Sequence, residues 1–179
     1  MFICLFKRFS DLMMAQLDPV QVAFDSAIRD FRDKLQNDDL YRDIVQVKSI
    51  GEVYDATDKL QQEQGKKGHL RHLSKIAPYL NRINDYKNAI DIFIQVKPDI
   101  LGLIWGPIVL LLQWASILNT SFDAILNTIQ EIGQALPDFE RAARLFDQNK
   151  LIKDVLLLFF KDILEFYLVA FNFFRLSRK

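Results

Sequence analysis

The stretch ILGLIWGPIVLLLQWASIL, residues Ile100 to Leu118, carries no charged side chain and decides the fold class. It holds both tryptophans and, at its centre, the pair Gly106-Pro107. Pro98, just before it, fits the first turn of a helix, where a missing backbone N–H costs nothing. Because Pro107 removes one hydrogen bond inside that helix, we predict a kink near residues 104–106.

This stretch suits two environments, a membrane or the centre of a helical bundle. A charge-free run of about 18 or more residues is long enough to cross a bilayer. However, Gln113 and Ser116 interrupt the apolar run, and no basic cluster flanks it to set an orientation. A helix that is apolar on all sides also fits a bundle centre, which the amphipathic helices elsewhere in the chain can cover. We therefore predict a buried central helix and keep membrane contact as the alternative.

Composition supports a folded all-α domain. The 179 residues suffice for one domain with a sizeable core, and half of them are apolar. Lys and Arg together number 23, as do Asp and Glu, so no net charge attracts nucleic acid. Cys4 is the single cysteine, which excludes an internal disulfide and fits the reducing cytoplasm. No sustained alternation typical of strands is present.

Apolar residues recur at helical spacing on both sides of the central stretch. A first helix begins at Pro19, with Asp18 as a cap, and ends at Asn37-Asp38-Asp39. Ser49 and Glu52 form a capping box for a second helix, which carries an apolar stripe to Leu60. The polar segment QQEQGKKG, residues 61–68, is predicted to be the most exposed loop of the chain.

The remaining elements follow the same logic. A third pattern runs from Leu70 to Ile94, and Pro78 kinks or splits it. After the central helix, Thr120 or Ser121 caps a helix that Gly133 closes, and Pro137 opens a short one. These patterns predict a single-domain antiparallel bundle of about six to eight helices at residues 18–179, preceded by a loosely ordered arm at residues 1–17.

The last predicted helix, about Lys150 to Phe174, is the most apolar one that contains charges. Its polar residues project to nearly one angle on a helical wheel, so we expect a thin polar stripe and burial on most other sides. The stripe consists of Asp154, Lys161, Glu165 and Asn172.

The first 14 residues, MFICLFKRFSDLMM, are apolar but interrupted by charge. The apolar run Phe2 to Phe6 is too short for a signal peptide, so no secretion signal is predicted. Phe2, Phe6 and Phe9 with Lys7 and Arg8 suit an amphipathic arm, which could also touch a membrane interface. An upstream start codon is the third explanation for this segment.

No group of residues stands out as a catalytic, cofactor-binding or metal-binding set. His69 and His72 lack the further ligands that zinc needs. The segment 65–68, GKKG, lacks the spacing of a phosphate-binding loop. The remaining carboxylates are predicted to be helix-end or surface residues: Asp38, Asp39, Glu131, Asp138 and Glu140. We therefore predict no enzyme, no small-molecule substrate and no nucleic-acid partner.

Three phrases of the sequence resemble a known family when taken in order. They are LIWGPI at residues 103–108, IGQALPDF at residues 132–139 and FFKDILEFY at residues 159–167. Together they resemble the uncharacterised helical domain at the N-terminus of fungal STAND proteins, which are NLR-like and carry NACHT NTPase domains with ankyrin or other repeats. The resemblance extends over roughly residues 18–174.

The resemblance implies a signalling module linked to non-self recognition and cell death, and it supplies no catalytic residues. The chain itself holds no Walker A motif and no repeats, so we expect a stand-alone copy, a truncated product or an excised domain. The expected function is binding of a protein partner or self-association. The alternative is a membrane-active effector whose apolar helices insert into lipid.

Overall fold

The computed structural model describes residues 19–66, 73–93, 97–117, 122–145 and 150–177, and every element in them is helical. The all-α bundle predicted from the sequence is therefore confirmed. The described elements are α2 (Pro19–Leu35), α3 (Asp38–Gln46), α4 (Ile50–Lys66), the 3-10 helix η1 (Leu73–Ile76), α5 (Ala77–Phe93), α6 (Pro98–Ile117), α7 (Phe122–Ala135), α8 (Phe139–Leu145) and α9 (Lys150–Ser177).

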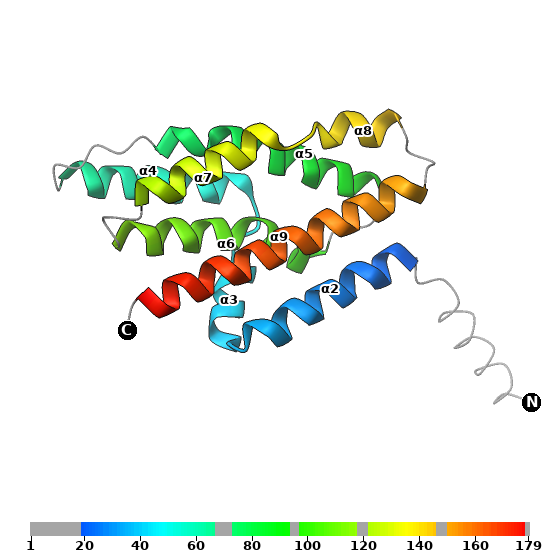
Figure 1. Cartoon of the computed structure of the whole chain (residues 1–179), viewed down its shortest axis with the longest axis horizontal. Helices are drawn as coiled ribbons and strands as arrows, with labels where there is room; N and C mark the ends of the chain where they lie inside the picture. Colours follow the sequence, from blue (N-terminus) through cyan, green and yellow to red (C-terminus); the bar gives the residue numbers. More distant parts are fainter. Residues whose placement is uncertain (1–18, 67–72, 94–96, 118–121, 146–149, 178–179) are drawn as a thin grey trace, which may run out of the picture.

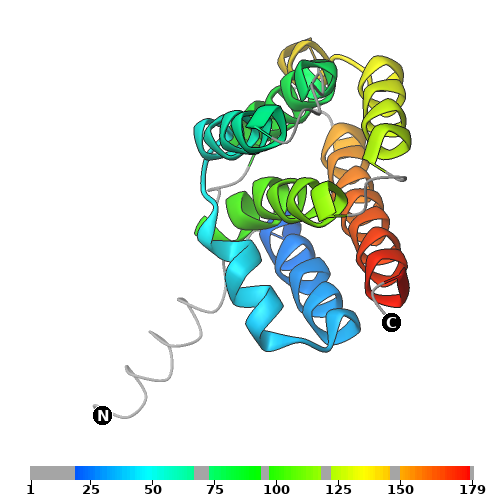
Figure 2. The ribbon, with the colours of Figure 1, turned by 90° about the vertical axis from the view of Figure 1, so that its left-hand side faces the viewer.

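Helix α6 lies at the centre of the molecule, with the other helices around it (Figures 1 and 2). It contacts α3, α4, α5, α7 and α9, and the eight residues 102–109 are all buried. The predicted burial of this apolar helix is confirmed. Among the described residues, no helix meets the length and hydropathy needed to cross a membrane.

Two glycines on α6 allow α3 to approach its backbone closely. Gly102 and Gly106 are four residues apart and therefore share one face of the helix. A Cβ atom on Gly106 would stand 2.0 Å from the carbonyl oxygen of Ile44, and one on Gly102 would stand 2.6 Å from the Cα of Val45. Since any side chain would collide with backbone, the absence of Cβ atoms at both positions permits this contact.

Pro107 lies inside α6, and the helix continues on both sides of it. The proline has no N–H to donate to the carbonyl of Leu103, which weakens that turn. Next to it, the hydroxyl of Tyr167 on α9 donates to the carbonyl oxygen of Ile104 at 3.3 Å. The Tyr167 oxygen lies 3.1 Å from that of Tyr79 on α5, so buried hydroxyls join three helices at the proline turn.

The buried tyrosines predict an alkaline limit to stability. Burial raises the pKa of Tyr79 to about 12, and it raises the pKa values of Tyr86 and Tyr167 well above their ordinary value. The folded chain therefore holds these protons above about pH 10, where the unfolded chain releases them. Stability is fully present below about pH 10, and each tyrosine should remove up to about 1.4 kcal/mol per pH unit above it.

Urea unfolding at several pH values would measure this loss. The denaturation midpoint should stay level up to about pH 10 and then fall, and Tyr79→Phe should make the fall less steep. A midpoint that does not change between about pH 9 and 11 would contradict the burial of these hydroxyls.

The structure also corrects several predicted boundaries. Asn37, expected at the end of the first helix, instead caps α3, since its side-chain oxygen accepts a hydrogen bond from the Leu40 amide at 2.9 Å. Helix α3 was not predicted at all. Residues 61–66, expected to form a loop, are the last turns of α4. Gly133 does not end α7, which continues to Ala135, and a Cβ atom there would lie 2.4 Å from the Tyr79 nitrogen.

Other predicted boundaries agree with the structure. Helix α2 begins at Pro19, and Pro78 lies in the first turn of α5, directly after η1. The capping box is present before α4: the Glu52 amide donates to the Ser49 hydroxyl at 3.3 Å, and that hydroxyl donates to the Glu52 carboxylate at 3.1 Å. The expectations for residues 1–18, including the arm and the Asp18 cap, lie outside the described residues.

Helices α2 and α9 lie side by side and run in the same direction (Figure 1). The ring centroids of Phe24 and Phe160 are 5.0 Å apart, and further along both helices Leu35 and Phe171 line one hollow. Through this packing α2 covers one flank of α9. The side of α9 opposite its core contacts is not covered by any described helix, as the exposure of its residues shows.

Candidate interaction surface

The outer side of α9 carries a row of exposed apolar side chains, which we call the α9 apolar face. The exposed fractions are 65% for Leu151, 59% for Leu158, 64% for Val169 and 53% for Phe173, and Val155 is also exposed. All five residues lie within about 55° of the direction opposite the buried side of the helix, at 100° per residue. Large apolar side chains so exposed in one row are typical of a surface that another molecule covers.

This face was missed in the sequence, where α9 was expected to be buried on most sides. The predicted polar stripe is present, because Asp154, Lys161, Glu165 and Asn172 are all exposed. It lies beside the apolar face, on the flank toward α2, rather than opposite the core. Asp162 lies within the apolar face itself. The outer side of α9 thus presents three carboxylates and one ammonium around an apolar row.

On its other flank, the α9 apolar face continues into a groove against α7. The groove has a volume of about 250 Å³ and is lined mostly by apolar side chains. Val169 and Phe173 belong to both the groove and the α9 apolar face, and Ile129 of α7 forms the opposite wall. The apolar surface therefore broadens toward the C-terminal end of α9, where it suits a side chain inserted from a partner.

The exposure of the polar stripe predicts that Glu165→Leu leaves the fold intact. Because this carboxylate faces solvent, its loss should change the free energy of unfolding by no more than about 0.5 kcal/mol. A urea melt at low protein concentration, compared with the parent chain, would measure it. Unfolding of the variant would mean that Glu165 belongs to a buried polar network.

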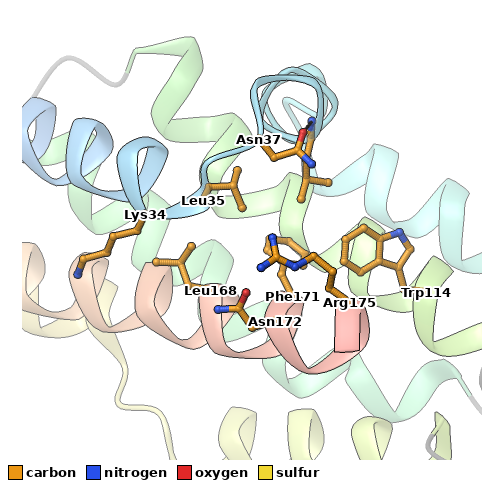
Figure 3. Close-up of a pocket in the computed structure, with 9 residues that line it drawn as sticks. Lys34, Leu35, Asn37, Trp114, Leu168, Phe171, Asn172 and Arg175 are labelled. Atoms are coloured by element: carbon orange, nitrogen blue, oxygen red, sulfur yellow. Dashed lines mark hydrogen bonds between the residues drawn. The ribbon is translucent and has the colours of Figure 1, made fainter. Parts of the chain in front are cut away.

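A second hollow lies where α2, α3, α6 and α9 meet (Figure 3). Leu168 and Phe171 line it, and Trp114 stands at one side. The side chain of Arg175 lies between Phe171 and Trp114. The ammonium end of Lys34 points away from the other lining residues (Figure 3). The volume of about 210 Å³ is below the roughly 300 Å³ at which ligand pockets begin, so this hollow is a minor surface feature.

Four of the five carboxylates considered in the sequence form ion pairs or cap a helix, and the fifth is exposed on the surface. Asp38 accepts from Arg32 at 2.8 Å at the start of α3, and Asp39 pairs with Arg42. Asp138 caps α8 by accepting from the Arg141 amide at 2.9 Å. Glu140 accepts from the guanidinium of Arg144 at 2.6 Å and from Asn88 at 3.3 Å; these hydrogen bonds lower the pKa of its carboxyl group. Glu131 is exposed on α7.

Asp138 and Glu140 line one open hollow of about 460 Å³ together with Asp85, Arg141 and Arg144, whereas Asp38, Asp39 and Glu131 do not line it. In the described part of the chain, no three His, Cys, Asp or Glu side chains are grouped to hold a metal ion. Gly65 is exposed in the last turn of α4, whereas residues 67 and 68 and the two histidines, His69 and His72, lie outside the described residues. Among the described residues, the α9 apolar face is the surface on which exposed large apolar side chains gather along one helix.

Fold and surface together define an all-α bundle domain with an exposed apolar helix face. The chain belongs to the family described as a domain of unknown function, DUF7708, which matches residues 74–179. The matched part runs from η1 to the end of the chain and so includes both α6 and α9. No curated protein and no solved structure matches the chain.

Proposed function

We propose that this chain is a non-catalytic protein-interaction domain and that the α9 apolar face is its contact surface. The observation that carries this proposal is the row of five exposed large apolar side chains on one helix. Elsewhere in the described residues, exposed large apolar side chains are scattered over α2, α4, α5 and α8. Scattered apolar residues are normal on a protein surface, whereas a continuous row marks a binding site.

The finer proposal is that the domain acts in signalling, as in the N-terminal modules of fungal NLR-like STAND proteins. It rests on the three sequence phrases, and two of them lie on the central helix α6 and on α9. LIWGPI lies in the buried centre of α6, while FFKDILEFY lies on α9 and includes Asp162 in the apolar face. In this proposal, the protein contact made by the domain serves signalling in the cytoplasm.

The alternative is a membrane-active effector. Its main support in the sequence was the charge-free run now found at the centre of the bundle, where residues 102–109 are buried. Insertion of this run would require the surrounding helices to leave it, which would expose the core. The α9 apolar face needs no such rearrangement to bind a protein, and this difference favours the interaction function.

A photo-crosslinking amino acid at position 158 in the full chain would test the proposal in cells. Leu158 is the best position, because it lies near the middle of the α9 apolar face. We expect adducts with a protein that mass spectrometry identifies and that binds the purified chain in reconstitution. The same probe at Asp58, exposed on α4, is the matched control and should not give this adduct.

Two results would contradict the proposal. Equal adducts from positions 158 and 58 would show that the α9 face has no special affinity for proteins. Adducts with phospholipid alone would assign the face to membrane binding. A Val169→Glu substitution within the face should reduce the protein adduct by at least about tenfold, provided that the circular dichroism spectrum is unchanged.

A further inference from the structure

The hollow of Figure 3 has a neighbour along the seam between α2 and α9. This second hollow has a volume of about 170 Å³ and shares two lining residues, Lys34 and Leu168, with the first. Each hollow alone is smaller than the roughly 300 Å³ at which ligand pockets begin, but the two together exceed it. We call the pair of adjoining hollows the α2–α9 groove.

The length of the groove suits a lipid chain. Its lining residues on α9 extend from Lys161 to Arg175, a distance of about 21 Å at 1.5 Å per residue. The hydrocarbon core of a bilayer is about 30 Å thick, so a lipid chain in one leaflet spans about 15 Å. The groove is therefore long enough for one such chain with a head group at its end.

The floor of the groove is apolar along this length. Six apolar side chains from α2 and α9 line it, and all are buried except Leu168, which is half-buried where the two hollows meet. They are Ala27, Phe31, Leu35, Leu164, Leu168 and Phe171. At the end toward α3 and α6, Leu40 and Trp114 add an apolar wall. A narrow floor of this kind suits a single hydrocarbon chain.

The charges on the rim differ between the two ends of the groove. In the smaller hollow, Lys34 and Lys161 are balanced by Asp30 and Glu165. In the larger hollow, Lys34 and Arg175 stand without any carboxylate among the lining residues. Within the described part of the chain, no carboxylate forms an ion pair with these three cations. The end of the groove at Arg175 is therefore positively charged and suits an anion.

The groups at this end match one carboxylate. The guanidinium of Arg175 presents its N–H groups as a fork that fits the two oxygens of a carboxylate. The side-chain oxygen of Asn37 accepts from the Leu40 amide, which leaves the NH₂ group of Asn37 to donate, and Asn172 lies exposed beside it in the lining. Because the ammonium of Lys34 points away (Figure 3), a single cation faces the head group, as a single negative charge requires.

We propose that the α2–α9 groove binds a long-chain fatty acid, with the carboxylate at Arg175 and the chain extending toward Ala27. This site goes beyond the proposed function, because the groove lies on the α2 flank of α9 and shares no residue with the α9 apolar face. The groove between α7 and α9 has no charged lining residue. It offers a hydrocarbon chain an apolar surface but offers no partner for a carboxylate.

Equilibrium dialysis of the full chain against radiolabelled hexadecanoic acid, kept below the concentration at which it forms micelles, measures the dissociation constant. We expect saturation at one molecule per chain. Dodecanoic and octanoic acid should bind progressively more weakly. Complete burial of one CH₂ group is worth about fourfold in affinity, and the groove is open on one side, so a loss of about twofold per carbon is expected. Hexadecanol, which lacks the charge, should bind at least about tenfold more weakly than the acid.

Substitutions at the two parts of the groove should act differently. Arg175→Gln should weaken the binding of hexadecanoic acid by on the order of tenfold and leave that of hexadecanol unchanged, because it removes only the charged partner. Arg29→Gln, exposed on α2 outside both hollows, is the matched control and should change neither. Leu168→Trp should block the junction of the hollows and weaken hexadecanoic acid more than octanoic acid, provided that the circular dichroism spectrum is unchanged.

Several results would overturn the proposal. One is the absence of saturable binding, and another is an equal affinity of Arg175→Gln and Arg29→Gln for hexadecanoic acid. Tighter binding of a single-chain phospholipid than of the fatty acid would assign the charged end to a phosphate instead of a carboxylate. If Val169→Glu abolished binding and Leu168→Trp did not, the fatty acid would lie on the α9 apolar face and not in the α2–α9 groove.

Discussion

Replacing Gly106 with alanine is expected to destabilise the domain by about 4 kcal/mol or more, the range of the most severe single substitutions. The added Cβ would lie 2.0 Å from the Ile44 carbonyl oxygen and 2.7 Å from its carbon. Both atoms belong to the backbone of α3, which cannot move aside as a flexible side chain can. The higher helix propensity of alanine returns only about 1 kcal/mol, so the steric conflict dominates.

Urea unfolding followed by circular dichroism would measure this loss. Gly65→Ala is the matched control, because no atom lies within 4 Å of the Cβ position there and the residue is exposed on α4. It should stabilise the domain by up to about 1 kcal/mol through helix propensity alone. If Gly106→Ala were as stable as the parent chain, α3 would not lie against this face of α6.

Trp105→Ala is expected to cost about 3–5 kcal/mol, the range found when a buried large aromatic side chain is truncated. The indole is 2% exposed and belongs to the central helix, so its removal leaves a cavity among several packed helices. Chemical denaturation measured at equilibrium would show the loss as a lower midpoint with a similar slope.

Tyr54→Ala is a useful comparison for the tryptophan. This aromatic residue is 40% exposed on α4, and its truncation should cost far less than that of Trp105, because it leaves no enclosed cavity. An equal loss for the two variants would mean that Trp105 does not have the central packing role described above.

The sequence predicted the elements that depend on local pattern. The charge-free run from Ile100 indicated a buried helix because such a run must avoid water, and the Ser49–Glu52 box marked the start of α4 by its own hydrogen bonds. Helix α3 escaped prediction because it has only nine residues, and its capping residues Asn37, Asp38 and Asp39 also fit the end of α2. Its signals were an N-cap followed by Leu40, Tyr41 and Ile44 at helical spacing.

Features that depend on a partner in space could not be predicted in this way. The sequence showed Gly106 only as the neighbour of Pro107 and Gly133 as the end of a helix, whereas each meets the backbone of another helix that is distant in sequence. The α9 apolar face looked like core, because hydropathy records that a side chain is apolar and does not record what covers it. The face becomes recognisable only when α2 and α7 are seen to cover the flanks of α9 and leave the outer side open.

The contact of α3 with Gly102 and Gly106 has a consequence for how the chain can be divided. The family match begins within η1, yet α2, α3 and α4 before it pack against α6 and α9. Neither residues 19–66 nor residues 73–177 alone contain a complete core. If the chain is cut between Lys66 and Leu73, each of the two peptides should be poorly folded alone. Helical structure should return when they are mixed, because α3 of the first peptide can then pack against Gly102 and Gly106 of the second.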